Sequence, residues 1–112
     1  MDFNPSASQP NDEKFRNLVL FISQRSIGDK WFGAVKLNKL LFYADFFAYL
    51  KYGNSITGHE YQKLENGPAP RALLPILQQM EEQEELKRVT QDCYGRNQTR
   101  TIALQEPNLD LF

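Results

Sequence analysis

Apolar residues recur with helical spacing near the start of the chain. Four of them stand at positions i, i+3, i+4 and i+7: Phe15, Leu18, Val19 and Ile22. This is the pattern of an amphipathic helix. Asn11 can cap its start, and Gly28 lies just past its expected end, where a left-handed glycine would close the helix. The residues before it have little to bury, so we expect a flexible tail over residues 1–11 and a single domain over residues 12–112.

A second helix is expected from about residue 34 to residue 52, and it is apolar on most of its circumference. One side carries an aliphatic stripe that we expect to be buried: Leu37, Leu40, Leu41, Ala44, Phe47 and Ala48. The other side is mainly aromatic: Phe42, Tyr43, Phe46, Tyr49 and Leu50. A helix that is apolar on most sides is usually buried on most sides. In a chain of 112 residues, this requires wrapping by the other elements or by a partner protein.

The middle of the chain predicts a short strand and a third helix. Residues 60–64 are expected to form the strand, and the Gly-Pro-Ala-Pro segment at 67–70 a rigid connector. Pro70 can serve as the first helical residue. Pro75 then either begins the helix proper after a short turn or kinks the helix, because proline lacks the N–H that a helix interior needs. Three residues face inward in both versions: Leu73, Leu77 and Met80.

The C-terminal part predicts a β-hairpin. Its strands are expected at residues 86–91 and 99–105, with a turn at residues 94–97 and with Val89, Ile102 and Leu104 as the apolar positions. The expected fold class is therefore α+β: three main helices, a short strand and a C-terminal β-hairpin.

Composition and charge narrow the function classes. The formal net charge is −1, which gives no electrostatic basis for strong, non-specific nucleic-acid binding. The single cysteine, Cys93, excludes an internal disulfide and fits a cytoplasmic protein. No secretory signal and no apolar run of membrane-spanning length is present, so no membrane association is expected.

The chain shows no constellation for catalysis or cofactor binding. His59 is the only histidine and has no cysteine nearby, so a zinc site is not expected. Nothing places His59 beside Cys93 or a serine, and the scattered glycines fit no phosphate-binding loop. We expect no enzymatic activity, no metal and no cofactor.

Asp45 and Asn38 are polar residues within the aromatic helix. Because an unpaired buried carboxylate is costly, Asp45 is either a structural acceptor for a tyrosine hydroxyl, a backbone amide or a lysine, or a charged anchor for a partner's arginine or lysine. Asn38 lies two turns earlier on the same face and can join either network. We favour structural roles for both residues.

A DNA-binding protein is the alternative interpretation. The hairpin has a basic bias, and helices followed by a basic hairpin are typical of winged-helix proteins. Its basic residues are Lys87, Arg88, Arg96 and Arg100. The third helix, however, ends in an acidic run and lacks a basic recognition face, and a strand falls after the second helix.

Three consecutive segments together resemble the Panacea domain, also called the SocA-like or phage-associated GepA-like antitoxin domain. They are KLNKLLFYAD at residues 36–45, KYGNSITG at 51–58 and EYQKLENGPAPRAL at 60–73. With the hairpin, the resemblance covers about residues 15–104. Relatives often have an acidic or polar residue where His59 stands.

The resemblance implies an antitoxin that neutralises a cognate protein toxin by direct contact. One branch of the family resembles a proteolytic adaptor that delivers its toxin to a ClpXP-type protease. Relatives commonly continue with an acidic helix, so we expect either a short member or a chain truncated after Phe112. The Panacea-like domain is expected over residues 12–112.

The expected partner surface lies on the aromatic side of the second helix. Large exposed aromatics mark contact sites more often than scattered single apolar residues do. We predict that this surface contains Tyr43, Phe46 and Tyr49, with Lys39 and Arg71 near its rim. The competing interpretation is that these rings are core residues.

Overall fold

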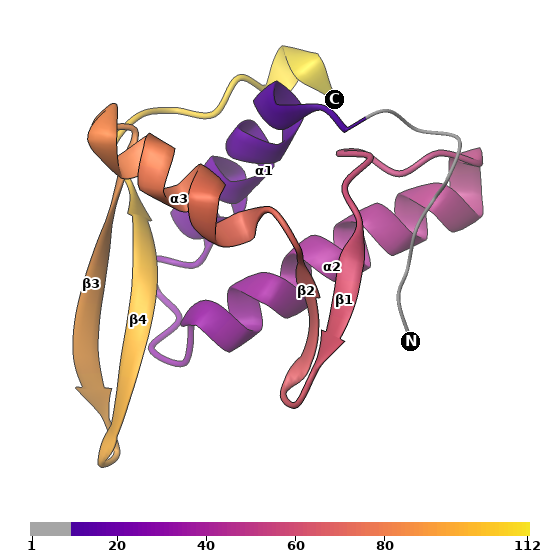
Figure 1. Ribbon diagram of the computed structural model, residues 1–112. Coiled ribbons are helices and arrows are strands. Elements are labelled where there is room, and N and C mark those ends of the chain that lie inside the picture. Colours follow the sequence, from indigo (N-terminus) through magenta and orange to yellow (C-terminus); the bar gives the residue numbers. More distant parts are fainter. Residues whose placement is uncertain (1–9) are drawn as a thin grey trace.

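The computed structural model describes residues 10–112, so most of the expected tail lies outside the described residues. The described residues form three α-helices and two separate β-hairpins, arranged as in Figure 1. The helices are α1 (Asp12–Arg25), α2 (Ala34–Tyr52) and α3 (Leu73–Glu82). The hairpins are β1 (Tyr61–Leu64) with β2 (Gly67–Pro70) and β3 (Leu86–Cys93) with β4 (Arg96–Ala103), and a 3₁₀ turn, η1 (Leu109–Leu111), follows. The predicted α+β class is confirmed.

The start of α1 follows the sequence prediction, but its end does not. The side chain of Asn11 accepts a hydrogen bond of 2.9 Å from the Lys14 N–H and caps the helix. The backbone N–H of Asn11 also donates to the Thr57 carbonyl at 2.8 Å. At the other end, the Ser26 N–H closes the helix on the Ser23 carbonyl, so the prediction of a left-handed cap at Gly28 was wrong. A helix that ends with such a short-range hydrogen bond needs no residue with positive φ after it.

The bounds of α2 agree with the prediction, and Gly53 closes it in the left-handed conformation with φ 81°. The inward line of the helix is Leu37, Leu41 and Asp45, one turn apart. Leu40 and Ala44 are only half-buried beside it. Phe47 was wrongly predicted to be buried, since its side chain is 60% exposed. The carboxylate of Asp45 faces the protein interior, and this orientation turns Phe47 outward.

The segment 67–70 forms strand β2 rather than a connector, because its prolines occupy compatible positions. β2 pairs antiparallel with β1, with Tyr61 opposite Pro70 and Lys63 opposite Pro68. The next pair in the same register, Arg71 with Glu60, is hydrogen-bonded. Because hydrogen-bonded pairs alternate, both prolines fall where a backbone N–H would point away from β1. The missing N–H groups therefore cost this ladder nothing.

Helix α3 begins at Leu73, so neither of the two starts that the sequence left open, Pro70 and Pro75, is its first residue. Pro75 is its third residue and lies in the first turn, where an N–H has no partner within the helix. The Ile76 N–H makes the first bond, to the Ala72 carbonyl. The three residues predicted to face inward are buried, and so is Ile76.

The hairpin β3–β4 is longer than predicted and has a tighter turn. Tyr94 and Gly95 form a two-residue turn with φ 52° and 80°, and Leu104 lies just outside β4. Positive φ at both positions matches the twist of a two-residue hairpin. The hydroxyls of Thr101 and Ser23 share a buried hydrogen bond of 2.5 Å, which joins β4 to α1.

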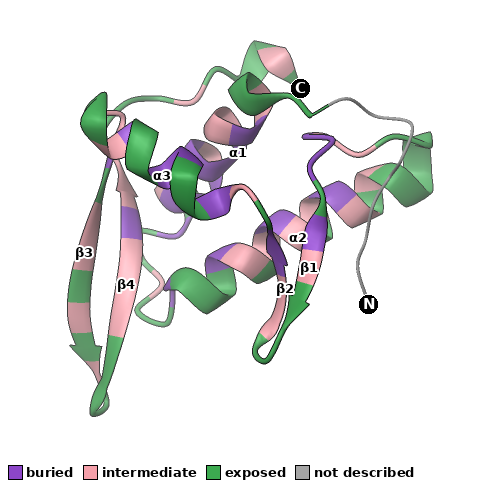
Figure 2. Ribbon diagram, in the orientation of Figure 1, coloured by how far each residue is buried: buried purple, intermediate pink, exposed green. Residues whose placement is uncertain are grey.

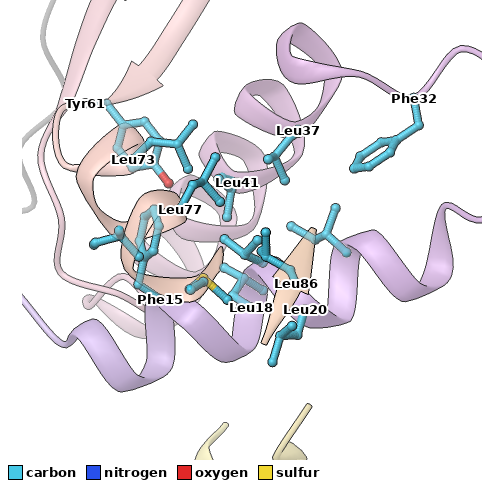
Figure 3. Close-up of a cluster of buried hydrophobic side chains, with 14 residues drawn as sticks. Phe15, Leu18, Leu20, Phe32, Leu37, Leu41, Tyr61, Leu73, Leu77 and Leu86 are labelled. Atoms are coloured by element: carbon cyan, nitrogen blue, oxygen red, sulfur yellow. The ribbon is translucent and has the colours of Figure 1, made fainter. Parts of the chain in front are cut away.

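One core unites these elements. Figure 3 shows side chains from all three helices, from β1 and from the start of β3 converging, and Figure 2 shows the buried surfaces of the helices facing inward. The fully enclosed members are Phe15, Val19, Phe32, Leu41, Tyr61 and Met80. The core therefore holds α2 by one side only, and its opposite side faces solvent.

Candidate protein-interaction surface

Asp45 fixes the orientation of α2. Its side chain is fully buried and accepts three hydrogen bonds. The Thr57 N–H donates to Oδ1 at 2.8 Å, and the hydroxyls of Thr57 and Tyr61 donate to Oδ2 at 2.6 and 2.7 Å. All three donors come from the segment that follows the helix, so this carboxylate faces the interior of the chain and not its surface.

The Tyr61 hydroxyl is held in its donor form. Its burial, and then the charge and hydrogen bond of Asp45, raise the pKa of Tyr61 above its ordinary value. A protonated hydroxyl continues to donate to Asp45 at every physiological pH. The junction between α2 and β1 is therefore a fixed support for the surface on the far side of α2.

That surface is what we call the aromatic face, consisting of Tyr43, Phe46, Phe47 and Tyr49. The ring centroids of Tyr43 and Phe47 lie 6.0 Å apart, as do those of Phe46 and Phe47. Tyr43 is 48% exposed, Phe47 60% and Tyr49 38%, whereas Phe46 is half-buried. Within the aromatic face, Tyr43, Phe46 and Phe47 therefore form a connected set of rings, and Tyr49 adds further exposed area. Phe47 was predicted to belong to the buried stripe of this helix, although its position four residues after Tyr43 also places it next to that ring.

The face is anchored to the core through stacked rings. Phe46 stacks on Phe42 at 5.5 Å, and Phe42 packs edge-on against the buried Tyr61 at 5.5 Å. Rigid aromatics held in this way lose little entropy when a partner covers them, which is the property of interface anchors.

The two predicted rim cations occupy different places. Lys39 is exposed one turn before Tyr43, so it borders the aromatic face. Arg71 follows β2, where its guanidinium contacts Gln62 at 3.3 Å and Glu60 at 3.8 Å. It lines a separate cavity, described next, so the structure does not bring Arg71 to the aromatic face.

A groove of about 460 Å³ lies between the two hairpins. Its lining residues come from both hairpins, from the first half of α2 and from the start of α3. Figure 1 shows how these elements are arranged. Leu37, Leu73 and Leu77 supply part of its apolar lining, and the exposed Leu74 stands at its rim. We call it the inter-hairpin groove.

Asn38 lies between this groove and a smaller cavity beside the β1–β2 turn. Its Oδ1 atom is buried and has no hydrogen-bond partner among the described residues. Asn38 therefore does not belong to the Asp45 network, although it lies two turns earlier on the same helix.

His59 and Cys93 have separate surroundings in the structure. His59 is buried against the ring of Phe15, and its Nε2 atom lies 2.8 Å from Asp12 Oδ1. Cys93 lies at the end of β3, with its sulfur 3.8 Å from the Lys30 carbonyl oxygen. Within residues 10–112, no group of three potential metal ligands comes together. No helix in that range has the length and apolar character to cross a membrane.

The chain matches a known family. The family model described as antitoxin SocA-like, Panacea domain, matches residues 37–108, from the first turn of α2 to the residue before η1. No curated protein and no solved structure matches the chain. The matched range contains the aromatic face, the Asp45 network and most of the inter-hairpin groove.

Proposed function

This chain belongs to the SocA-like antitoxin family with the Panacea domain, and we propose from this premise that it neutralises a protein toxin by direct contact through the aromatic face of α2. The supporting observation is the exposure of Phe47 and Tyr43 on a helix whose opposite side is fixed in the core. Interfaces are enriched in such aromatic anchors. Lys39 borders this face and supplies a cation for the rim of the interface.

The test measures toxin affinity and stability on the same variants. The candidate toxin is the product of the gene beside this one, purified with and without the antitoxin. Phe47→Ala removes an exposed anchor, so we expect about 2 kcal/mol weaker binding, or roughly 30-fold, with an almost unchanged unfolding midpoint. Isothermal titration and urea unfolding give the two quantities.

Leu41→Ala is the matched control from the buried side of the same helix. It should lower the free energy of unfolding by about 2–5 kcal/mol, and its folded fraction should bind the toxin normally. If instead Phe47→Ala lowers stability and leaves the affinity of the folded protein intact, the aromatic face is a core surface and this interface assignment fails.

Two modes of neutralisation remain separable by experiment. Occlusion alone leaves the toxin's lifetime unchanged, whereas an adaptor of a ClpXP-type protease shortens it. We expect occlusion to suffice, so toxin activity should be suppressed by the purified antitoxin with no protease present. Toxin activity that persists in the presence of the antitoxin and without protease would favour the adaptor mechanism.

The winged-helix alternative is not favoured by the hairpin's arginines. Arg88 is hydrogen-bonded to Glu81, whose pKa this bond lowers, and Arg100 donates to the Ser26 carbonyl at 2.8 Å. Two of the hairpin's cations are thus engaged within the protein. We expect no sub-micromolar DNA binding at about 150 mM salt, where non-specific contacts weaken. A gel-shift or anisotropy titration that finds tight, sequence-specific binding would support the alternative.

A further inference from the structure

The exposed side of α2 extends beyond the aromatic face in both directions. Val35, one turn before Lys39, is 43% exposed, and Leu50, one turn after Phe47, is 62% exposed. With Tyr43 these residues form one exposed row along α2, in which neighbours are three or four positions apart. At 1.5 Å per residue the row is about 22 Å long. We call it the outer ridge.

The exposed charges of α2 all have one sign. Its only carboxylate, Asp45, is fully buried, whereas Lys36, Lys39 and Lys51 are exposed. Lys36 is paired with Asp29. Within residues 10–112, Lys39 and Lys51 form no ion pair, and the ammonium of Lys51 lies 5.3 Å from the centre of the neighbouring Tyr52 ring. The outer ridge is therefore an apolar row flanked by lysines without acidic partners in the described chain.

The ridge ends beside two cavities at the start of α2. One, of about 450 Å³, is lined by the α1–α2 loop, the start of α2 and the turn end of the β3–β4 hairpin, with Trp31, Val35 and Arg96 among its residues. Among the described residues that line it there is no carboxylate. The other, beside the β1–β2 turn, is lined by Val35 and Glu65. The cations around the ridge thus outnumber its carboxylates, which favours an acidic partner.

A helix is the element best suited to cover this ridge. The backbone groups along α2 are bonded within the helix, so an extended segment that lies on it finds no backbone partners there. A partner helix satisfies its own backbone and presents side chains at the same spacing of three and four residues, which lets the two rows interdigitate. Amphipathic helices bind proteins in this way, through apolar anchors one turn apart.

Two other classes of partner fit the ridge less well. Segments that bind anionic membranes usually carry about four to eight cations, whereas α2 exposes three lysines, one of them paired. Protein–DNA interfaces are strongly positive and polar. The middle of the ridge is instead formed by Tyr43, Phe47 and Leu50, which are exposed apolar residues.

From these features, we propose that the outer ridge binds an acidic, amphipathic α-helix of the toxin, about 15 residues long and lying along α2. The apolar side of this helix covers Tyr43, Phe47 and Leu50, and its carboxylates pair with Lys39 and Lys51. The inference rests on the proposed function for the identity of the partner. It adds the secondary structure, the charge and the extent of the segment that the partner contributes.

The first experiment tests the ridge without the toxin. Three synthetic peptides of about 18 residues, or five helical turns, are titrated against the full chain. The first carries a leucine and phenylalanine row flanked by glutamates, the second has lysines in place of the glutamates, and the third scrambles the first so that the row is lost. Fluorescence anisotropy gives the affinities, and circular dichroism reports helix formation.

We expect the glutamate peptide to bind and to gain helix, and the lysine peptide to bind about tenfold more weakly or less. The scrambled peptide should not bind, because it has the same charge without the apolar row. No binding of the glutamate peptide, or equal binding of the lysine peptide, would overturn the proposal.

Two pairs of variants locate the bound helix on the full chain. Lys39→Glu and Leu50→Ala should each weaken the glutamate peptide and the toxin about tenfold or more. Their controls are Lys87→Glu, exposed on β3, and Ile27→Ala, 66% exposed in the α1–α2 loop, neither of which should change the affinities. Urea unfolding should give all four variants nearly the same midpoint as the parent. Equal effects of ridge and control variants would contradict the assignment.

The toxin measurement separates this inference from the proposed function. Toxin binding that is sensitive to Phe47→Ala, but not to Lys39→Glu or Leu50→Ala, would overturn the inference and leave the proposed function standing. Binding of the glutamate peptide without any toxin binding would remove the proposed function and leave the ridge as a site for an acidic helix. Flotation of the chain with phosphatidylglycerol vesicles, lost in Lys39→Glu and without peptide binding, would assign the ridge to a membrane and overturn the proposal.

Discussion

Asp45 shows how one buried side chain decides which way a helix faces. On an apolar helix, a carboxylate is ordinarily expected to mark the solvent side, because burying it is costly. Here three donors from Thr57 and Tyr61 compensate for that cost. Asp45 therefore lies on the side of α2 that faces the core. The sequence indicated that tyrosine and amide donors were one solution, but it could not show that the donors follow the helix.

Removal of the Asp45 carboxylate should destabilise the protein severely. Asp45→Ala leaves three buried donors without an acceptor, and each unsatisfied group costs about 1–3 kcal/mol, so we expect a loss of at least about 3 kcal/mol. Tyr61→Phe deletes only one donor and should cost about 1–2 kcal/mol. Urea unfolding measures both, with the exposed Glu82→Ala as the control. A loss below about 1 kcal/mol for Asp45→Ala would contradict this account.

At the scale of elements, the sequence predicted helices better than it predicted their faces. The bounds of α2 followed from its apolar run and from Gly53, which takes the left-handed cap. The buried side did not follow, because a helix with apolar residues all round gives no amphipathic signal. Phe47 was therefore assigned to the core, although its ring contacts those of Tyr43 and Phe46 and is 60% exposed.

Strand β2 was missed for a different reason. Two prolines in four residues argue against a strand unless each falls at a position whose N–H would point outward. That condition depends on the register with β1, which no local pattern reveals. The inter-hairpin groove was missed in consequence, because one of its walls is this unexpected strand.

The β3–β4 turn offers a clean test of backbone conformation. Gly95 has φ 80°, and a Cβ at this position would meet no atom within 4 Å. Gly95→Ala should therefore act through the left-handed conformation alone and cost about 1–2 kcal/mol. Gly28→Ala, which also has open space but no positive φ, is the matched control and should have little effect. Thermal unfolding compares the two variants, and equal melting temperatures would contradict the argument.

At the scale of the whole molecule, the β3–β4 hairpin is joined to the α1–α2 loop by hydrogen bonds and a ring stack rather than by a second core. Gln98 donates to the carbonyl oxygens of Lys30 and Phe32 at 3.0 and 2.9 Å, and the Trp31 and Tyr94 rings stack at 5.0 Å. Leu86 at the start of β3 enters the common core. The hairpin that forms one wall of the groove should thus fold together with the helices that carry the aromatic face.

Trp31 makes this cooperativity measurable, because it is the only tryptophan and lies at the junction between the α1–α2 loop and the hairpin. Its fluorescence reports the docking of the hairpin, while far-ultraviolet circular dichroism reports mainly the helices. If the molecule is one cooperative unit, the two urea transitions should coincide. Tyr94→Ala should change the fluorescence of the folded protein, because it removes the stacked ring, and should leave the two midpoints equal to each other. A fluorescence transition that precedes the loss of helix would show that the hairpin undocks independently. The wall that this hairpin contributes to the inter-hairpin groove would then move independently of the helices.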